Sequence, residues 1–465
     1  MTVKAIMPVR LLNPVEPLGH KPTAMRTTET SEPQQLAFWS GAVTGLIGES
    51  LRPGDVDSSK LSRTPATTPS SRTSRTATAT GTTRTTGTGF VRSADSIAPS
   101  GAPFSMADLV QAWLDCRRHK RQSASAQAFE AHAEKNLCAL RAELLSQTYT
   151  PGRSTCFVVT RPKLREVWAA DFRDRIVHHL LYNQIAPCFH AGFVAGSSAC
   201  IEGRGTLYAA KRLEADVRSI TQNWSKPAFY LKLDLSNFFV AIDKHILRAQ
   251  IARKVPAGWW LDLADTILFH DPRTNMELRG SAKLLAQVPP HKSLFNAPAD
   301  TGLPIGNLSS QFFANVHLDT LDQFAKHQIK ARHYVRYVDD FILLHESPQW
   351  LHAALKRFEA WLPERLGAHL NPTKTILQPV DRGIDFVGHV IKPWRRTTRK
   401  RTMATAISRL RSMPADEVFT AGNSYLGLLR QASHSHADRA DLAKVLRWRG
   451  HAVNGELTKI YRKKP

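Results

Sequence analysis

The sequence lacks any closely spaced pair of cysteines. None of its five cysteines falls in a Cys-x-x-Cys pair, so we predict neither a zinc ribbon nor a thioredoxin-like redox site, and a reducing, cytoplasmic environment fits best. No membrane span is predicted, because the longest uncharged run, residues 176–201, contains histidines, amides and a proline that hydrocarbon would not accommodate. The N-terminus shows no basic start followed by an apolar core and a cleavage site, so secretion is not predicted either.

Acidic residues are also scarce. The chain of 465 residues carries 39 Asp and Glu against 63 Lys and Arg, a formal net charge of +24, so its expected partner is a polyanion. At roughly 150 residues per domain, this length predicts about three domains. A hydrophobic content of 42% is enough to build their cores.

The first part of the chain has too little apolar surface to fold alone. Residues 61–89 consist almost wholly of Thr, Ser, Ala, Gly, Pro and Arg. Ordering such a segment costs about 1–2 kcal/mol per residue, which it cannot recover by burial. We therefore predict a low-complexity, disordered extension over residues 1–103. A solvated tether or a misassigned start is favoured over loose RNA contact by its arginines.

Globular patterning begins at residue 104. Ser105 is the expected N-cap of a first helix, and apolar residues from Phe129 to Leu145 recur near a 3.6 period, which predicts a second helix. Further predicted elements are strands at 156–160 and 229–235, a helix at 173–185, and two strands around a tight turn at 334–344. Helical and basic sequence dominates after Trp394.

Three carboxylates carry the strongest chemical signal. Asp339 and Asp340 stand at the predicted hairpin apex, and neighbouring carboxylates repel each other unless cations lie between them. Asp234 ends the apolar strand 229–234 and supplies a third carboxylate. Three carboxylates can hold two Mg²⁺ ions, one of which activates an attacking hydroxyl while the other stabilises the leaving oxygen. The pattern therefore predicts nucleotidyl transfer.

Seven sequence blocks occur in a distinctive order. They are 161–170 (RPKLREVWAA) with 174–179 (DRIVHH), 203–206 (GRGT), Asp234 with Phe239, 302–311 (GLPIGNLSSQ), 337–340 (YVDD), 370–375 (LNPTKT) and 386–389 (FVGH). In these blocks and their order the chain resembles the reverse transcriptases, most closely those of diversity-generating retroelements, from about Phe104 to Tyr461. The resemblance implies an α+β fold, the right-hand polymerase. Its parts would be fingers at 104–228, a palm with an antiparallel sheet at 229–392 that includes a connection at 256–300, and a basic helical thumb at 393–465.

The block from Ile305 to Gln311 indicates the branch. Retroviral enzymes place Gln before the glycine of this block, and group II intron enzymes usually end it in Ser-Pro, whereas the sequence here is IGNLSSQ. The resemblance implies copying of a template RNA into cDNA, error-prone at adenines, for targeted diversification of a variable gene. The alternatives are an antiphage defence enzyme or an orphan group II intron-like reverse transcriptase. A non-catalytic RNA-binding scaffold is disfavoured by the intact carboxylates.

The resemblance also assigns roles to individual residues. Lys163 and Arg165 would contact the dNTP triphosphate, Phe239 would select the deoxyribose, and the backbone carbonyl of Leu235 would complete the metal shell. Lys374 would protonate the departing pyrophosphate. Ile305, Gly306 and Gln311 would line the nascent base pair, with the glycines letting the backbone approach it closely. The cations expected to bind nucleic acid are Arg175, Lys392, Arg395, Arg396, Arg399, Lys400 and Arg401.

The implied partners are template RNA, the RNA–DNA duplex and dNTPs. The resemblance adds a small, basic, oligomeric accessory protein. Because Ile305 replaces a hydrogen-bonding side chain beside the templating pair, we also expect lowered fidelity.

Overall fold

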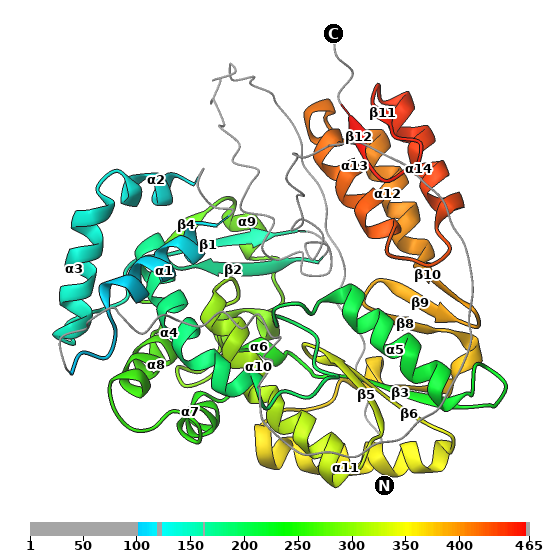
Figure 1. Ribbon diagram of the computed structural model, residues 1–465, viewed down its shortest axis with the longest axis horizontal. Helices are drawn as coiled ribbons and strands as arrows, with labels where there is room; N and C mark the ends of the chain where they lie inside the picture. The colour runs from blue at the N-terminus through cyan, green and yellow to red at the C-terminus, as the bar shows by residue number, and fades with distance from the viewer. Residues whose placement is uncertain (1–100, 119–122, 161–162, 462–465) are drawn as a thin grey trace, which may run out of the picture. The chain divides into compact units, whose positions relative to one another are not determined.

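The computed structural model describes residues 101–118, 123–160 and 163–461 (Figure 1). Residues 1–100 of the extension expected at 1–103 lie outside the described ranges. The first described elements are α1 (Met106–Arg117), α2 (Ala124–Glu130), α3 (Ala133–Leu145), β1 (Ser154–Val159), β2 (Arg165–Ala169) and α4 (Phe172–His190). Ser105 is the N-cap of α1, as predicted. Its Oγ accepts the Asp108 N–H at 3.2 Å, and its own N–H donates to Asp108 at 2.9 Å.

The helix predicted across residues 129–145 is two helices. The chain leaves helical geometry at His132, where φ is −135° and ψ is 44°. The side-chain amide of Asn136 donates to the Phe129 carbonyl at 2.9 Å and satisfies it at the break. Phe129 and Leu137 nevertheless pack into the same core, which is why the apolar period continues across both helices.

A four-stranded antiparallel sheet in the order β5-β6-β3-β7 occupies the middle of the chain. Its strands are β3 (Phe229–Asp234), β5 (His333–Tyr337), β6 (Asp340–His345) and β7 (Ile376–Pro379). Successive side chains enter different cores: Leu231 packs with α11 (Pro348–Leu366), and Tyr230 packs with α5 (Thr206–Ile220). Figure 1 shows these helices on the two sides of the sheet.

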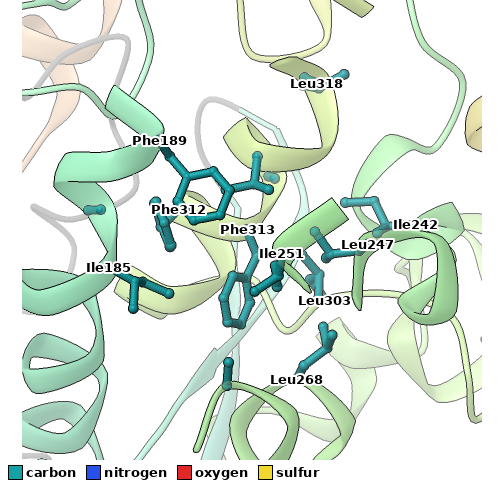
Figure 2. Close-up of a cluster of buried hydrophobic side chains, with 14 of the residues drawn as sticks. Ile185, Phe189, Ile242, Leu247, Ile251, Leu268, Leu303, Phe312, Phe313 and Leu318 are labelled. Atoms are coloured by element: carbon teal, nitrogen blue, oxygen red, sulfur yellow. The ribbon is translucent and has the colours of Figure 1, made fainter. Parts of the chain in front are cut away.

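The larger core surrounds α10 (Leu308–Gln323). Phe312 and Phe313 of α10 lie among side chains of several other helices, including Ile185, Leu247 and Leu268 (Figure 2). The remaining elements between β3 and α10 are α6 (Phe238–Ala241), α7 (Lys244–Ala252), α8 (Trp259–Phe269), β4 (Met276–Arg279), α9 (Ala282–Leu285) and the short turns η2 (Pro290–Lys292) and η3 (Leu294–Asn296). Strand β4 joins β1 and β2 in a separate three-stranded sheet.

The C-terminal elements begin with a small sheet and continue as helices. They are β8 (Ile384–Phe386), β9 (His389–Lys392), β10 (Arg395–Thr398), α12 (Lys400–Ser412), α13 (Ala415–Leu429), α14 (His436–Trp448), β11 (Ala452–Val453) and β12 (Ile460–Tyr461). Three short elements precede them: η4 (Phe324–Gln328) follows α10, and η5 (Pro372–Lys374) and η6 (Val380–Arg382) lie before and after β7. Residues 395–398, expected in a helical region, therefore pair with β9, and the first helix starts at Lys400. Helices α12, α13 and α14 share a core of their own. Within the described ranges, none of the helices is both long and apolar enough to cross a bilayer.

Candidate active site

Two strands of the central sheet bring three carboxylates together. In the register of β3 and β6, Asp234 lies directly opposite Asp340. Residues paired in this way have Cα atoms about 4.5–5.5 Å apart. The N–H of Leu235 donates to the carbonyl of Asp339 at 3.2 Å, so the hairpin tip is fastened to the end of β3.

A buried arginine supports the hairpin tip. Val338 has a φ of 55°, a left-handed conformation that a β-branched residue rarely adopts. The Arg336 guanidinium donates to the Val338 carbonyl at 3.2 Å and to both carboxylate oxygens of Asp322 at 2.7 and 2.6 Å. Both side chains are fully buried. Our sequence reasoning missed Arg336, although its position directly before the 337–340 block was a signal.

Two lysines neutralise the carboxylates. Lys374 on η5 lies 2.5 Å from Oδ1 of Asp234, and Lys232 on β3 lies 3.1 Å from Oδ2 of Asp340. Burial, with the nearby charges of Asp234 and Asp340, raises the pKa of Asp339 to about 6. Burial also raises the pKa of Asp340, and the Lys232 charge opposes that rise.

Further cations lie in the same electrostatic neighbourhood. Desolvation lowers the pKa of Lys163, and the charges of Lys374, Arg165 and Lys292 lower it further. Desolvation likewise lowers the pKa of Arg165, while Asp339 opposes that decrease. Cations from three separate segments therefore influence the carboxylates, namely Lys232, Lys374, and Lys163 with Arg165. Lys292 was not among the residues we predicted.

The carboxylates fit a divalent cation by the chemistry of their donors. The structure shows no ready-made group of three or more His, Cys, Asp and Glu metal ligands within its described residues. However, Oδ1 of Asp340 is buried and has no hydrogen-bond partner among those residues. A buried carboxylate oxygen without a partner is costly, and carboxylate oxygens are the donors that hard divalent cations prefer. We conclude that Asp234, Asp339 and Asp340 fit such a cation.

The aromatic pair beyond Asp234 lies on a helix. We expected a strand here, but Asn237 has a φ of 49°, and Phe238 and Phe239 belong to helix α6. Phe238 is buried, whereas Phe239 is half-buried with its ring centroid 5.3 Å from that of Phe238. Both side chains pack in or against the larger core, so the nucleotide-selecting role of Phe239 stays a prediction.

The loop before α10 is held against β2. The Ile305 carbonyl accepts the Trp168 N–H at 2.7 Å. At Gly306, where φ is 128°, a Cβ atom would lie 2.9 Å from the Trp168 carbonyl oxygen. The close approach that Gly306 permits is thus to the protein's own strand, which differs from the approach to a base pair expected from the sequence. Gln311 is half-buried on α10, one turn beyond Asn307, whose side chain accepts the Ala170 N–H at 3.1 Å.

A buried glutamate holds the connection at 256–300 against the sheet of β1, β2 and β4. The Glu166 side chain on β2 accepts hydrogen bonds from Ser293 Oγ at 2.7 Å and from Trp168 Nε1 at 3.0 Å. The Trp168 ring lies 4.9 Å from that of Phe295. Glu166 and Trp168 of the 161–170 block therefore fix the position of this part of the connection.

The predicted nucleic-acid cations differ in their surroundings. Arg396 is 6% exposed, is ion-paired with Glu214 and donates to the Gln431 carbonyl at 2.7 Å, so we remove it from the predicted surface. Arg399 is ion-paired with Asp385. Lys392, Arg175 and Arg399 are half-buried, and Arg395, Lys400 and Arg401 are exposed.

Arg175 also has an internal contact. Its Nε donates to the Ala170 carbonyl at 2.7 Å, and burial lowers the pKa of the guanidinium. Arg175 therefore stabilises the junction of β2 and α4, and its contact with nucleic acid stays a prediction.

An antiparallel sheet that presents carboxylates at a hairpin, with two lysines beside them, is consistent with the right-hand polymerase architecture. Residues 161–391 match the family model described as reverse transcriptase (RNA-dependent DNA polymerase). The chain thus contains a reverse transcriptase domain over these residues. The predicted α+β fold class is confirmed.

Among solved structures, the chain is similar to telomerase from Candida albicans in complex with a TWJ fragment of telomeric RNA. The identity is 13%, the TM-score is 0.39, and the match covers 65% of this chain and 56% of that chain. The chain therefore spans little more than half of that protein. No curated protein sequence matches it.

Proposed function

We propose that the enzyme copies a retroelement template RNA into cDNA, with two Mg²⁺ ions held by Asp234, Asp339, Asp340 and the backbone carbonyl of Leu235. The observation that carries the proposal is the register that sets Asp234 against Asp340 beside the hairpin tip. The bound ions would supply Lewis-acid activation of the primer hydroxyl and charge stabilisation of the leaving oxygen.

The place of Leu235 follows from strand geometry. In an extended strand, the N–H and C=O groups of one residue point to the same edge. Leu235 directly follows β3, and its N–H donates to the Asp339 carbonyl, so we expect its own carbonyl to face the hairpin that carries the carboxylates. It is therefore a suitable backbone ligand.

The cation cluster would bind the triphosphate. Lys163 and Arg165 are close enough to the carboxylates and to Lys374 for their charges to affect one another's pKa. Charge-assisted hydrogen bonds to phosphate are stronger than neutral ones, and preorganised donors suit the charge that develops on the leaving group. Lys374, as an ammonium group, could deliver a proton to the departing pyrophosphate.

Phe239 and the loop before α10 would shape the nucleotide pocket. The Leu303 N–H donates to the Phe239 main-chain carbonyl at 2.8 Å, so the backbone at Phe239 and the loop are held together. In our proposal, Phe239 packs beneath the sugar and excludes a 2′-OH. Ile305, Gly306 and Gln311 then border the nascent base pair.

The exposed cations from β9 to α12 would bind the RNA–DNA duplex. Three of these cations are exposed, namely Arg395, Lys400 and Arg401. Lys392, three residues before Arg395, is half-buried. Each phosphate that they neutralise releases condensed counterions, so the affinity would fall steeply with salt.

We further propose that the cDNA carries errors at template adenines and serves diversification of a variable gene, with a small, basic, oligomeric accessory protein as partner. The support is the IGNLSSQ block, in which Ile305 offers no side-chain hydrogen bond to the templating pair. Sequencing of cDNA made by an Ile305→Gln protein tests the fidelity. Unchanged adenine misincorporation would count against this role of Ile305.

One assay tests the whole proposal. The purified enzyme, with the RNA encoded beside its gene, a primer, Mg²⁺ and dNTPs, should extend the primer, and its cDNA should show substitutions at adenines. Accurate cDNA would favour the defence or orphan alternatives. No extension with this RNA or with a generic primed RNA would contradict the polymerase proposal itself.

A further inference from the structure

Lys232 lies inside the active-site sheet and touches one of its carboxylates. It stands on β3 two positions before Asp234, so both side chains point to the same face of the sheet. In the register of β3 and β6, Lys232 pairs with Ile342, which makes Asp340 its diagonal neighbour. Its Nζ lies 3.1 Å from Oδ2 of Asp340.

The ammonium group of Lys232 is anchored from a second side. Nζ donates to the main-chain carbonyl of Asp385 at 2.9 Å, and it lies 6.0 Å from the ring centroid of Phe386. Both residues belong to β8, outside the central sheet. The Lys232 side chain is only 14% exposed. A lysine held in this way cannot follow Asp340 freely, so it restricts the rotation of that carboxylate.

The two oxygens of Asp340 consequently differ. Oδ2 is engaged by Lys232, whereas Oδ1 is buried and lacks a hydrogen-bond partner among the described residues. We propose that Lys232 is a positioning residue, which keeps Oδ2 occupied so that Asp340 offers only Oδ1 to a divalent cation. This inference rests on the proposed cation site.

The proposal predicts opposite effects on binding and turnover. In Lys232→Met, the loss of a cation beside the site and the release of Oδ2 should tighten Mn²⁺ binding by about threefold or more, because like charges at short range repel. The same change should lower kcat by about tenfold to a hundredfold, since misplacing a group by about 1 Å can cost that much. A residue needed only for folding would weaken both properties together.

The experiment compares four proteins: the wild type, Lys232→Met, Lys232→Arg and Lys326→Met. Mn²⁺ binding is measured from free Mn²⁺ by electron paramagnetic resonance without nucleotides, and kcat and KM for dNTP are measured by primer extension with Mg²⁺. Lys326 is a matched control, because its Nζ also donates to main-chain carbonyls, those of Ala331 at 2.7 Å and Arg332 at 3.0 Å. Melting temperatures of all four proteins show how much stability each substitution removes.

The proposal is supported if Lys232→Met binds Mn²⁺ more tightly and has a reduced kcat. In that case Lys232→Arg should keep near-wild-type values, and Lys326→Met should keep both its Mn²⁺ binding and its kcat. Unchanged or weaker Mn²⁺ binding in Lys232→Met would overturn the proposal. An unchanged kcat would also overturn it, because Lys232 would then only neutralise the charge of Asp340. Failure of the wild type to extend a primer would defeat the proposed function, whereas a Lys232→Met protein identical to an active wild type would defeat only this inference.

Discussion

The ammonium group of Lys374 lies 2.5 Å from Oδ1 of Asp234. Main-chain hydrogen bonds join the two segments, since the Asn371 N–H donates to the Asp234 carbonyl at 2.8 Å and the Ser236 N–H donates to the His369 carbonyl at 2.8 Å. These bonds join the segment just before Lys374 to the end of β3 and so place Lys374 beside the carboxylates. Its side chain remains 45% exposed, which leaves it accessible to a substrate.

Replacing Lys374 should therefore slow the chemical step. We expect Lys374→Met to lower kcat for primer extension by about 10²–10⁴-fold, the usual contribution of a general acid. Single-turnover kinetics would measure it. Lys356→Met removes an exposed lysine paired with Glu359 and should have no effect. Equal rates for wild type and Lys374→Met would remove Lys374 from the mechanism.

Replacing Asp339 should abolish polymerisation without unfolding the protein. Asp339→Asn preserves the side-chain volume but removes a charge from the proposed cation site. Losing several kcal/mol of transition-state stabilisation by the cations would slow the reaction by at least about a thousandfold. Because burial and nearby carboxylates oppose ionisation of Asp339, the variant should melt no lower than the wild type. Primer extension and thermal melting are the measurements, and substantial residual activity would be the contrary result.

Arg395 and Arg396 should behave differently although they are neighbours. Arg395→Ala should weaken binding to the RNA–DNA duplex and reduce the salt slope of the affinity by about one, with an unchanged melting temperature. Arg396→Ala breaks a largely buried ion pair and should cost about 3–5 kcal/mol of stability. Salt titrations of binding and denaturant unfolding would test the pair. A loss of stability in Arg395→Ala alone would contradict the assignment.

Gly306 should not tolerate a side chain. In Gly306→Ala, the new Cβ would lie 2.8 Å from Val167 Cγ1 and 2.9 Å from the Trp168 carbonyl oxygen, at a φ of 128°. We expect a loss of about 1–3 kcal/mol and a raised KM for dNTP, as the loop moves away from β2. Gly455→Ala, with open space around the new Cβ, is the control. Similar stabilities for the two variants would refute the prediction.

His317 should make the protein less stable in acid. It is buried on α10, with Nδ1 2.9 Å from Gln250 Oε1, and burial lowers its pKa to about 4. As the pH falls from about 6.5 to about 4, the unfolded chain takes up a proton that the folded chain does not, so stability is lost. His317→Leu should reduce the decrease in melting temperature between about pH 7 and pH 5. The exposed His352→Leu should not, and identical decreases in both variants would rule out this contribution of His317.

Local patterns were enough to predict the elements of the site. The apolar run before Asp234 and the two apolar runs around Asp339 are the β3, β5 and β6 strands, and the N-cap at Ser105 is where the sequence placed it. Two elements were wrong for identifiable reasons. The helix break at His132 leaves the apolar period intact, and the strand Arg395–Thr398 is too short and too basic to show alternation.

The sequence alone determined the order of the motifs, the strands that end in carboxylates and the surplus of positive charge, because these depend on residues close together in the chain. Only the tertiary structure decided which charges face one another. Arg396 is buried against Glu214, Lys232 engages Asp340, and Glu166 clamps Ser293, because strand register and packing join segments far apart in sequence. A cation's role follows from the partners that the fold places around it, and those partners cannot be identified from its neighbours in the chain.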